Sequence, residues 1–532
     1  MSLPQPNHSA SGSVHTLDDA EKGLCDSTTN LTMVPSQPSV YLSHEKHGSI
    51  HDSRSTLLPL TPVHEGITPN PSQPELSLEF PKGRRPSVAA DLKTVVPKAK
   101  PVPPKVSRWV LACLWFNTYR KFFTFVVSLN LIGIVMAATG HFSYATSHLG
   151  ALVLGNLLMA IMMRNELWFR FLYLVSIYGL RSWAPIWMKL AVTSALQHAG
   201  GIHSGCASSA AAWLLYKVVD ILRYHAIQHP SVIATGIITN VFIIISIISA
   251  LPYIRNTHHN MFERYHRFIG WLGVAMTWVF VILGNQYDIK TGQWDNSANS
   301  LLSAQELWFA VFITVFVLLP WATLREVPVE VEIPSPKVAV LKFNRGMQQG
   351  LIGRVSRTAV MEYHAFGIIS EGRKSGTHYM ICGVQGDFTK SLVDNPPKTL
   401  WTRELKFAAV GHASAMYKRG IRICTGTGIG AALSTCIQSK DWFLIWIGSD
   451  QERTFGPTIS GLIHNNIEPE RMILWDSKKR GGRPDTMELL KDTWTRFGAE
   501  VIFITSNKQG NDEMMQGCQV AGLHAFGTLW DF

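Results

Sequence analysis

Three glycines at alternate positions, Gly426, Gly428 and Gly430, form the stretch of the chain whose spacing is best suited to chemistry. They follow the β-branched run 421–424 and precede small apolar residues of the kind that begin a helix. A strand, a tight turn and a helix start in this order present backbone N–H groups that can bind a pyrophosphate. The same pattern occurs as a plain turn in α/β units. The neighbouring segments must therefore decide between a turn and a dinucleotide-binding loop that includes Thr427.

The segments around this loop alternate between strand and helix patterns. The strand candidates are 421–424, 443–447, 471–475 and 501–505, and the helix candidates are 431–438, 457–465, 486–497 and 512–521. This rhythm is typical of a doubly wound parallel sheet. Arg453 follows the second strand, and Lys478, Lys479 and Arg480 follow the third, where cations can meet a 2′-phosphate. We therefore expect NADPH in preference to NADH, which stays a possible ligand.

Strand patterns without intervening helices precede this region. Positions 326–333 alternate apolar and charged residues with period two, and the runs 338–343, 350–357, 362–370 and 378–384 are similarly strand-like. Glycine or charged residues separate the runs, as is typical of antiparallel strands joined by turns. The sequence predicts a small antiparallel β-barrel over about 327–405.

The middle of the chain is strongly apolar, although the mean hydropathy of the whole is only +0.10. Six apolar runs cover about 122–140, 148–163, 204–222, 232–251, 267–284 and 306–323. Each is close to the ~17–25 residues that a membrane-spanning helix needs. Basic residues flank one side of these runs, and only Arg223 and Lys290 lie on the other. By the positive-inside rule we expect an integral membrane protein of the plasma membrane with both termini in the cytosol. The aromatic and basic segment 167–184 predicts a helix at the membrane interface.

The first 107 residues are rich in Ser, Pro, Thr, His and Asn and contain no apolar period, which predicts a disordered cytosolic tail. Within it, two arginines precede Ser87 at a spacing that basophilic kinases favour. The formal charge of +11 is explained by membrane flanks, so we expect no nucleic acid partner. Seven dispersed cysteines without a C-x-x-C pair argue against a disulfide framework and a zinc site. The expected parts are the tail 1–107, a transmembrane domain 108–325, a barrel 326–405 and a nucleotide-binding domain 406–532.

Six helices followed by a barrel and a glycine loop is the order seen in the ferric reductase and NADPH oxidase superfamily. The chain resembles that superfamily over about 110–532, and in particular its fungal TmpA-type membrane flavoproteins. Residues 363–366 resemble the flavin-binding His-Pro-Phe-Thr motif, residues 386–389 resemble Gly-Asp-Trp-Thr, and residues 482–484 match a later Gly-Arg-Pro segment. The chain printed above ends on Phe532, an aromatic residue that covers the flavin ring in the family.

The resemblance implies a β-barrel of the ferredoxin-reductase kind that binds FAD, followed by an NAD(P)-binding domain. The implied flavin contacts are His364, Phe366, Gly386, Asp387 and Thr389, with Phe532 as the catalytic flavin cover; the implied nucleotide contacts are Gly426, Thr427, Gly428, Gly430, Arg453, Gly482, Arg483 and Pro484. Ala365, Gly367 and Gly383 depart from the family's flavin motifs, and Ser506-Asn507 departs from its nicotinamide motif. These departures remove candidate contacts to the flavin and its phosphates, so FAD affinity is expected to be weak.

The family also binds two haems between paired histidines. Here His203 opens the third apolar run and His266 the fifth, but the next slots hold Tyr216 and Lys217, and Val279 and Phe280. The sequence therefore leaves two alternatives, a single b-type haem on His203 and His266 or no haem. Lys217 and Asp220 lie one turn apart in an apolar run, where they either pair or line a polar cavity.

Taken together, these observations favour a membrane-bound flavin oxidoreductase, and the resemblance implies a role in fungal developmental signalling linked to conidiation. It would take hydride from NAD(P)H to FAD at the cytosolic face and pass electrons to an unidentified acceptor. A second hypothesis is a catalytically weak signalling protein of the membrane that binds nucleotide. A transmembrane ferric reductase is a third.

Overall fold

The structure is a computed structural model that describes residues 106–529, apart from the side chains of His259 and Asn260. The predicted tail with Ser87, and the C-terminal Phe532, lie outside these residues. The described part contains a helical bundle, an antiparallel barrel and a parallel sheet, in that order along the chain.

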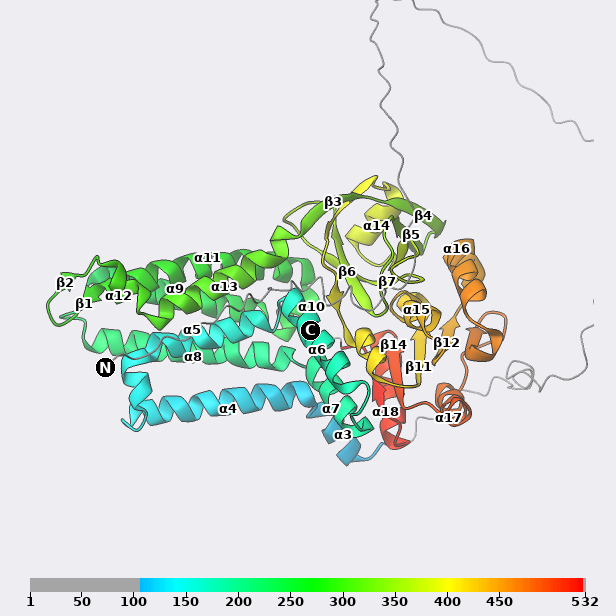
Figure 1. Ribbon diagram of the computed structural model, residues 1–532, viewed down its shortest axis with the longest axis horizontal. Coiled ribbons are helices and arrows are strands. Elements are labelled where there is room, and N and C mark those ends of the chain that lie inside the picture. The colour runs from blue at the N-terminus through cyan, green and yellow to red at the C-terminus, as the bar shows by residue number, and fades with distance from the viewer. Residues whose placement is uncertain (1–105, 530–532) are drawn as a thin grey trace, which may run out of the picture. The chain divides into compact units, whose positions relative to one another are not determined.

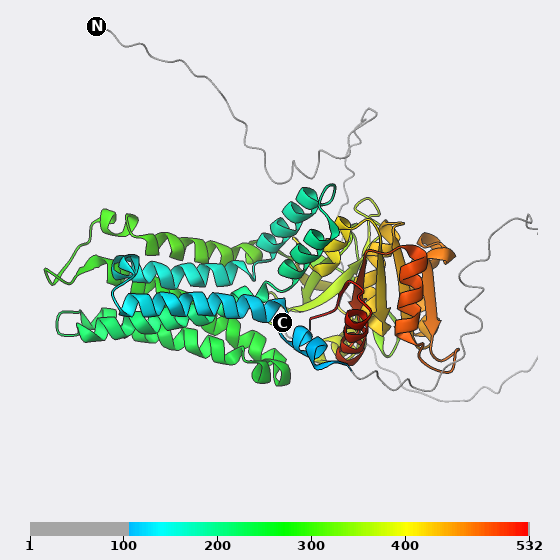
Figure 2. The same cartoon turned by 90° about the horizontal axis from the view of Figure 1, so that it is seen from below.

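Six long helices form the bundle, and Figures 1 and 2 show them side by side: α4 (Thr118–Ala138), α5 (Ser143–Met162), α8 (Gly200–Arg223), α9 (Pro230–Ser249), α11 (His259–Gln286) and α13 (Gln305–Ala322). By length and composition, each of these six is apolar enough to cross a membrane. The helices expected from the six apolar runs are thus confirmed. Shorter helices accompany them: α3 (Arg108–Trp115), α6 (Glu166–Leu180), α7 (Ile186–Gln197), α10 (Pro252–Thr257) and α12 (Ala298–Leu302).

Small residues and amide side chains hold the bundle together. Gly201 and Gly205 of α8 lie against α4, where an added Cβ would meet the Tyr119 carbonyl oxygen or Val126 Cβ, the latter at 3.0 Å. This spacing of small residues permits close helix approach. The Oδ1 atom of Asn130 accepts hydrogen bonds from Asn156 Nδ2 (3.0 Å) and Trp213 Nε1 (2.9 Å), which joins α4, α5 and α8.

The barrel contains β3 (Leu324–Pro328), β4 (Glu330–Ser335), β5 (Val338–Phe343), β6 (Leu351–Ser356), β7 (His364–Ile369), β8 (His378–Gly383), β9 (Thr399–Arg403) and β10 (Phe407–Ala408), with α14 (Asp387–Asp394) between β8 and β9. The strand order is β3-β9-β6-β7-β8-β5-β4, and β10 pairs with β6. The single strand expected at 326–333 is wrong. It is two strands, because the chain changes partners after Pro328: β3 pairs with β9, whereas β4 pairs with β5.

The last domain is a five-stranded parallel sheet in the order β13-β12-β11-β14-β15. Its strands are β11 (Gly420–Thr425), β12 (Trp442–Gly448), β13 (Met472–Asp476), β14 (Val501–Thr505) and β15 (Ala525–Phe526); its helices are α15 (Ile429–Gln438), α16 (Gln451–Asn466), α17 (Thr486–Phe497) and α18 (Lys508–Val520). Helices cover both faces, so the predicted doubly wound sheet is confirmed.

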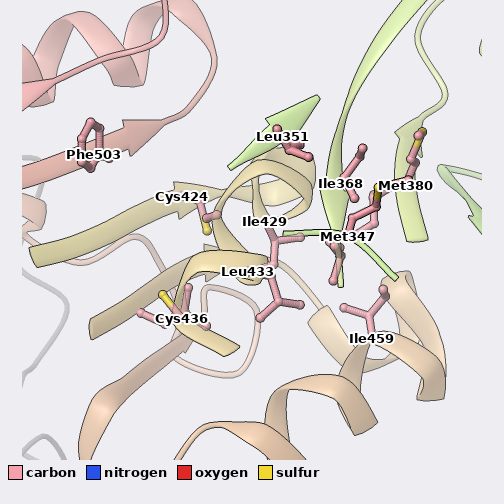
Figure 3. Packing of buried hydrophobic residues seen from close by; sticks show 14 of the residues in the cluster. Met347, Leu351, Ile368, Met380, Cys424, Ile429, Leu433, Cys436, Ile459 and Phe503 are labelled. Carbon is pink, nitrogen blue, oxygen red and sulfur yellow. The ribbon is translucent and has the colours of Figure 1, made fainter. Parts of the chain in front are cut away.

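One hydrophobic core connects the barrel to the sheet. Figure 3 shows Leu351, Ile368 and Met380 of the barrel beside Ile429 and Leu433 of α15. The other face of the sheet packs a separate core against α17 and α18. Because α15 is buried between the two domains, the start of this helix is fixed relative to the barrel.

Candidate functional site

The dinucleotide loop lies at the point where the strand order of the parallel sheet reverses. The chain runs from β11 to β12 and β13 on one side, and then to β14 and β15 on the other. Gly426–Gly428 follow β11 as a 3₁₀ turn and lead directly into α15. The hydroxyl oxygens of Thr425 and Ser506 lie 2.8 Å apart and join the ends of β11 and β14. Such switch points are where ligands bind in doubly wound sheets.

Two of the three predicted loop glycines are required by the local geometry. Gly426 has a φ of +51°, in the left-handed region that favours glycine. A Cβ on Gly428 would lie 2.4 Å from the carbonyl oxygen of Thr505. The indole Nε1 of Trp446 donates to the Gly426 carbonyl at 2.9 Å and fixes the turn. A rigid turn before the N-terminus of α15 has the backbone arrangement that binds phosphate.

Sequence reasoning missed an acidic residue beside this loop. Asp450 follows β12 and, among the non-glycine residues of 106–529, it alone has a positive φ, +53°. Its N–H donates to Asp476 Oδ1 at 3.0 Å, and its carboxylate accepts from Lys478 Nζ at 2.8 Å. An acid after the second strand is the group that binds a ribose hydroxyl in dinucleotide folds. The feature of the sequence that could have identified Asp450 is its position at the end of a predicted strand, shortly after Gly448.

Asp476 holds this acidic corner in place. Burial opposes its ionisation, but the N–H groups of Asp450, Lys478, Lys479 and Gln451 outweigh burial and lower the pKa of Asp476. The carboxylate therefore stays charged and ties the end of β13 to the start of α16. This bonding also explains how Asp450 is kept in the left-handed conformation.

The basic residues expected to meet a 2′-phosphate are largely engaged with other groups. Lys478 pairs with Asp450, and Lys479 pairs with Glu452 at 3.3 Å. The guanidinium of Arg480 lies 4.4 Å from the ring centre of Trp475. Arg453 is exposed in the first turn of α16, three residues after Asp450. A 2′-phosphate would have to displace these partners.

The segment Gly482–Pro484 has a local structural role. The Gly482 carbonyl accepts from Trp475 Nε1 at 2.9 Å, and Arg483 is exposed. The next residue, Asp485, caps α17 by accepting from the N–H groups of Met487 and Glu488 at 3.0 Å. The structure thus uses this segment to connect β13 to α17.

The expected flavin residues form an aromatic surface at one side of the barrel. The rings of His364 and Phe388 are stacked with centres 4.1 Å apart, and Phe366 lies 6.3 Å from Phe388. The Thr389 hydroxyl accepts from the N–H groups of Gln385 and Gly386 and donates to the Gly386 carbonyl. Thr389 therefore closes the start of α14.

Asp387 is more exposed than the residues of this aromatic surface. Asp387 is exposed in the first turn of α14, whereas Thr389 is buried. A flat aromatic ring fits a surface built from His364, Phe366 and Phe388. The carboxylate of Asp387 is negatively charged, so it would not bind a phosphate of the cofactor.

Glycines let the barrel touch the dinucleotide loop directly. A Cβ on Gly367 would lie 2.5 Å from Ala431 Cα and 2.6 Å from the Gly430 carbonyl oxygen. A Cβ on Gly383 would lie 3.0 Å from Thr427 Cγ2. The two motif departures are therefore what allows β7 and β8 to pack on the loop. They fit a ring-binding surface next to the nucleotide loop, but they supply no cation for flavin phosphates.

The two histidines expected to bind haem form hydrogen bonds between helices. His203 Nδ1 lies 2.8 Å from the Ala160 carbonyl oxygen, and His266 Nδ1 lies 3.0 Å from that of Ser246. Each histidine therefore donates a hydrogen bond to a carbonyl group of a neighbouring helix. Within residues 106–529 no group of three or more His, Cys, Asp or Glu side chains could hold a metal ion.

A buried ion pair joins the bundle to the barrel. Glu166, the first residue of α6, accepts from Arg403 at 2.6 Å and from Arg354 at 3.1 Å. The Arg403 guanidinium also lies over the rings of Trp321 and Tyr363, 5.1 and 5.5 Å from their centres. Helix α6 is therefore tied to strands β6 and β9 through one carboxylate, and Arg403 also contacts Trp321 of α13 and Tyr363, which precedes β7.

Sequence comparison relates the chain to one kind of reductase. A family profile for the C-terminal domain of adenylate-forming reductase 03009 matches residues 410–532, which hold the parallel sheet. Adenylate-forming reductases 06235 and 03009 of Coprinopsis cinerea are each 27% identical over 423 residues, or 78% of this chain and 40% of theirs. The chain thus spans about two fifths of the length of these curated relatives. The matched region is longer than all the residues outside α3–α13 taken together. The similarity therefore includes part of the helical bundle.

Solved structures overlap the chain more loosely. A phthalate dioxygenase reductase superimposes with a TM-score of 0.31 at 8% identity, covering 39% of this chain and 68% of the other. CYP116B46 from Tepidiphilus thermophilus superimposes with a TM-score of 0.34 at 10% identity, covering 77% and 73%. These superpositions are too loose to define a shared fold.

The expected relationship to ferric reductases and NADPH oxidases, including the TmpA-type flavoproteins, is wrong, because both curated relatives are adenylate-forming reductases. The function built on it, conidiation signalling by a membrane flavin oxidoreductase of that superfamily, is overturned by the same finding. The haem on His203 and His266 loses its basis as well. Two of the motifs also have local structural roles: Thr389 caps α14, and Gly482–Asp485 leads into α17.

Proposed function

We propose that this chain is a pyridine-nucleotide-dependent reductase whose dinucleotide site is the crevice between Gly426–Gly428 and Ser506. The observation that carries the proposal is the rigid glycine turn at the switch point of a doubly wound sheet. The names of the two relatives, both reductases, support the same class.

Each side of the crevice has a distinct task in this proposal. The N–H groups of the turn and of the first turn of α15 bind the pyrophosphate. Asp450 accepts a hydrogen bond from the ribose, and Arg453 lies three residues further along α16. Ser506 and Thr425 close the far wall through their shared hydrogen bond. The bound nucleotide supplies a hydride.

A flavin is the partner that the barrel can offer to this nucleotide. We propose that FAD places its ring against His364, Phe366 and Phe388, next to the nucleotide loop that Gly367 and Gly383 bring close. A flavin accepts hydride and passes electrons onward, so an electron acceptor is also implied. The missing cation near Gly383 predicts that FAD is held weakly.

Binding and turnover by the full-length protein test the nucleotide site. Wild type is titrated with NADPH and NADH, and oxidation is followed with ferricyanide as an artificial electron acceptor. Gly428→Val adds side-chain atoms where even a Cβ meets the Thr505 carbonyl, and it is expected to weaken binding at least about tenfold, or ~1.4 kcal/mol. Gly461→Ala is the matched control, because its Cβ meets only Asn465 Nδ2 at 4.0 Å. A wild type that binds neither nucleotide contradicts the proposal.

We also propose that the six long helices span the plasma membrane with α3 and the parallel sheet on the cytosolic side. Their length and composition support this, as does the excess of basic residues at the helix ends nearest the barrel. Lys290→Cys in the turn between β1 (Tyr287–Asp288) and β2 (Gln293–Trp294), and Lys479→Cys after β13, place a thiol on each side. A membrane-impermeant maleimide added to intact cells should label the first and not the second. Equal labelling contradicts the topology.

A further inference from the structure

A small cavity lies inside the helical bundle, away from the proposed nucleotide site. Its volume is ≈ 30 Å³, and five helices contribute Gly150 and the polar residues Lys217, Thr239, Thr277, Asn285 and Glu306 to a lining that is mostly apolar. The remaining wall is apolar and includes Phe280. About 10–15 Å³ is enough for one water molecule, so the cavity has room for roughly two.

Gly150 brings two opposite charges together at this cavity. A Cβ on Gly150 would lie 2.6 Å from Glu306 Oε1 and 3.0 Å from Lys217 Nζ. Both charged atoms therefore lie within about 3 Å of the same point, and any larger residue would displace them. Among the ion pairs of the described residues, however, none joins Lys217 directly to Glu306. A water molecule that hydrogen-bonds to both fits a gap of this size.

The rest of the wall is suited to holding water. The Thr239 and Thr277 hydroxyls donate to the Thr235 and Gly273 carbonyls, so their oxygen lone pairs are available as acceptors. Asn285 Nδ2 donates to the Val281 carbonyl, which leaves its side-chain oxygen as a further acceptor. A charged lysine and a carboxylate in an apolar bundle are costly unless polar groups surround them. Water in the cavity meets that need.

Other ionisable groups around the cavity are few. Asp220 lies one turn beyond Lys217 on α8 and acts on it electrostatically. On α5, the Tyr144 hydroxyl donates to Gln305, the neighbour of Glu306, and His148 contacts the Tyr144 ring at 4.7 Å. The cavity-lining residues of α9 and α11 do not ionise. Lys217 and Glu306 are thus the two lining residues that can exchange a proton.

The cavity lies near one end of the bundle. Glu306 is the second residue of α13, and Asn285 is the last but one of α11. Figure 1 shows that these helix ends lie with α12 and the β1–β2 hairpin at one end of the bundle. The carboxylate therefore lies near the bundle surface, while Lys217 lies about two turns inside α8.

We propose that this cavity is a hydrated proton-binding site in which water links Lys217 to Glu306. A hydronium ion gives a proton to the Glu306 carboxylate, so that one O–H bond of hydronium breaks, one forms on the carboxyl group and a water molecule is left; the reverse step returns the proton to water. Protonation removes the negative partner of Lys217, so Asp220 becomes its nearest counter-charge. The inference is independent of the proposed nucleotide site.

Infrared spectroscopy of the full-length protein in lipid nanodiscs, titrated with acid, tests the proposal. Wild type is expected to show a carboxylic acid C=O band that grows as the pH falls and shifts in D₂O. Glu306→Gln should remove this band. Lys217→Met removes the nearby positive charge, so the band should persist to a pH higher by about 1 to 3 units. A wild type without such a band, or a band that neither substitution alters, overturns the proposal.

Glycine variants separate the cavity from a general effect on α5. Gly150→Ala places a methyl group between the two charges and should move the titration of the band. Gly155→Ala, on the same helix, meets only Phe309 Cζ at 3.8 Å and should leave the titration unchanged. Equal behaviour of these two variants overturns the role of the cavity.

A further variant keeps the test available if Glu306→Gln does not fold. Gly284 lines the cavity, and its Cβ would meet nothing within 4 Å. Gly284→Ala therefore reduces the water space without a clash, and it should slow the exchange of the band in D₂O. An exchange rate equal to that of wild type overturns the proposal.

Discussion

Two carboxylates at the first turns of helices face buried cations in different ways. Glu166 of α6 contacts Arg403 at 2.6 Å and Arg354 at 3.1 Å, and it is only 7% exposed. Glu306 of α13 approaches Lys217 at Gly150 but forms no direct ion pair with it among the described residues. A closed pair with several cations fixes the bundle against the barrel. An open pair beside a cavity leaves space for water. In our proposal, the separation of the charges distinguishes a structural pair from one that can exchange protons.

The largest expected effect comes from opening the closed pair. Glu166→Gln removes the charge that compensates Arg403 and Arg354, and loss of one partner of a buried pair costs about 3–5 kcal/mol. The free energy of unfolding of the full-length protein in detergent measures it. Glu306→Gln is the matched variant and is expected to cost less than half as much, because water already separates its charges. Equal costs would show that the two pairs do not differ.

A smaller effect is expected from a buried cation without a carboxylate partner. Burial lowers the pKa of Lys406 to about 8, and its Nζ donates to Thr402 Oγ1 and to the Arg403 carbonyl. Between that pKa and the usual 10.5, the unfolded chain binds the proton more strongly. Lys406 therefore makes stability rise as the pH increases through this window.

Lys406→Met should remove this contribution to the pH dependence. Wild type and variant are compared by unfolding with denaturant at several pH values from 7 to 11, on the order of one pH unit apart. The difference between their free energies of unfolding should change across the window and be constant below it. A difference that is the same at every pH contradicts the assignment.

The ion pair between Asp450 and Lys478, at the proposed nucleotide site, is half-exposed. Asp450→Ala removes the proposed ribose acceptor and releases Lys478, so NADH affinity should fall about tenfold, or ~1.4 kcal/mol. NADPH should lose less, because the released lysine can meet its 2′-phosphate. The ratio of the two dissociation constants is the measurement. An unchanged ratio removes Asp450 from the site.

The smallest effect is expected from an exposed pair. Glu330 is 65% exposed and accepts from Lys342 at 2.8 Å across β4 and β5. Surface pairs of this kind contribute little to stability because water and salt screen them. Glu330→Ala should therefore leave unfolding almost unchanged, whereas a loss comparable to that of Glu166→Gln would break the distinction drawn between closed and exposed pairs.

Local sequence patterns predicted much of the fold. The apolar lengths around α4 and α9, and the alternation of strands and helices after Gly420, depend on neighbouring residues and are visible in the chain. Strand partners are not local. The run 326–333 reads as one strand, yet β3 and β4 bond to different partners. The motifs did not identify the family for a related reason, since residues such as Thr389 and Gly482 also have local structural roles that a short pattern does not distinguish from binding.

The sequence by itself determined the six apolar helices, the barrel-like strands and the glycine loop, because period, length and turn residues act over a few positions. Only the tertiary structure decided which distant residues meet. Glu166 and Arg403 are far apart in the chain, as are Gly150, Lys217 and Glu306, and Asp450 gains its place from Asp476. Such meetings depend on how whole helices and strands pack, and no local pattern encodes them.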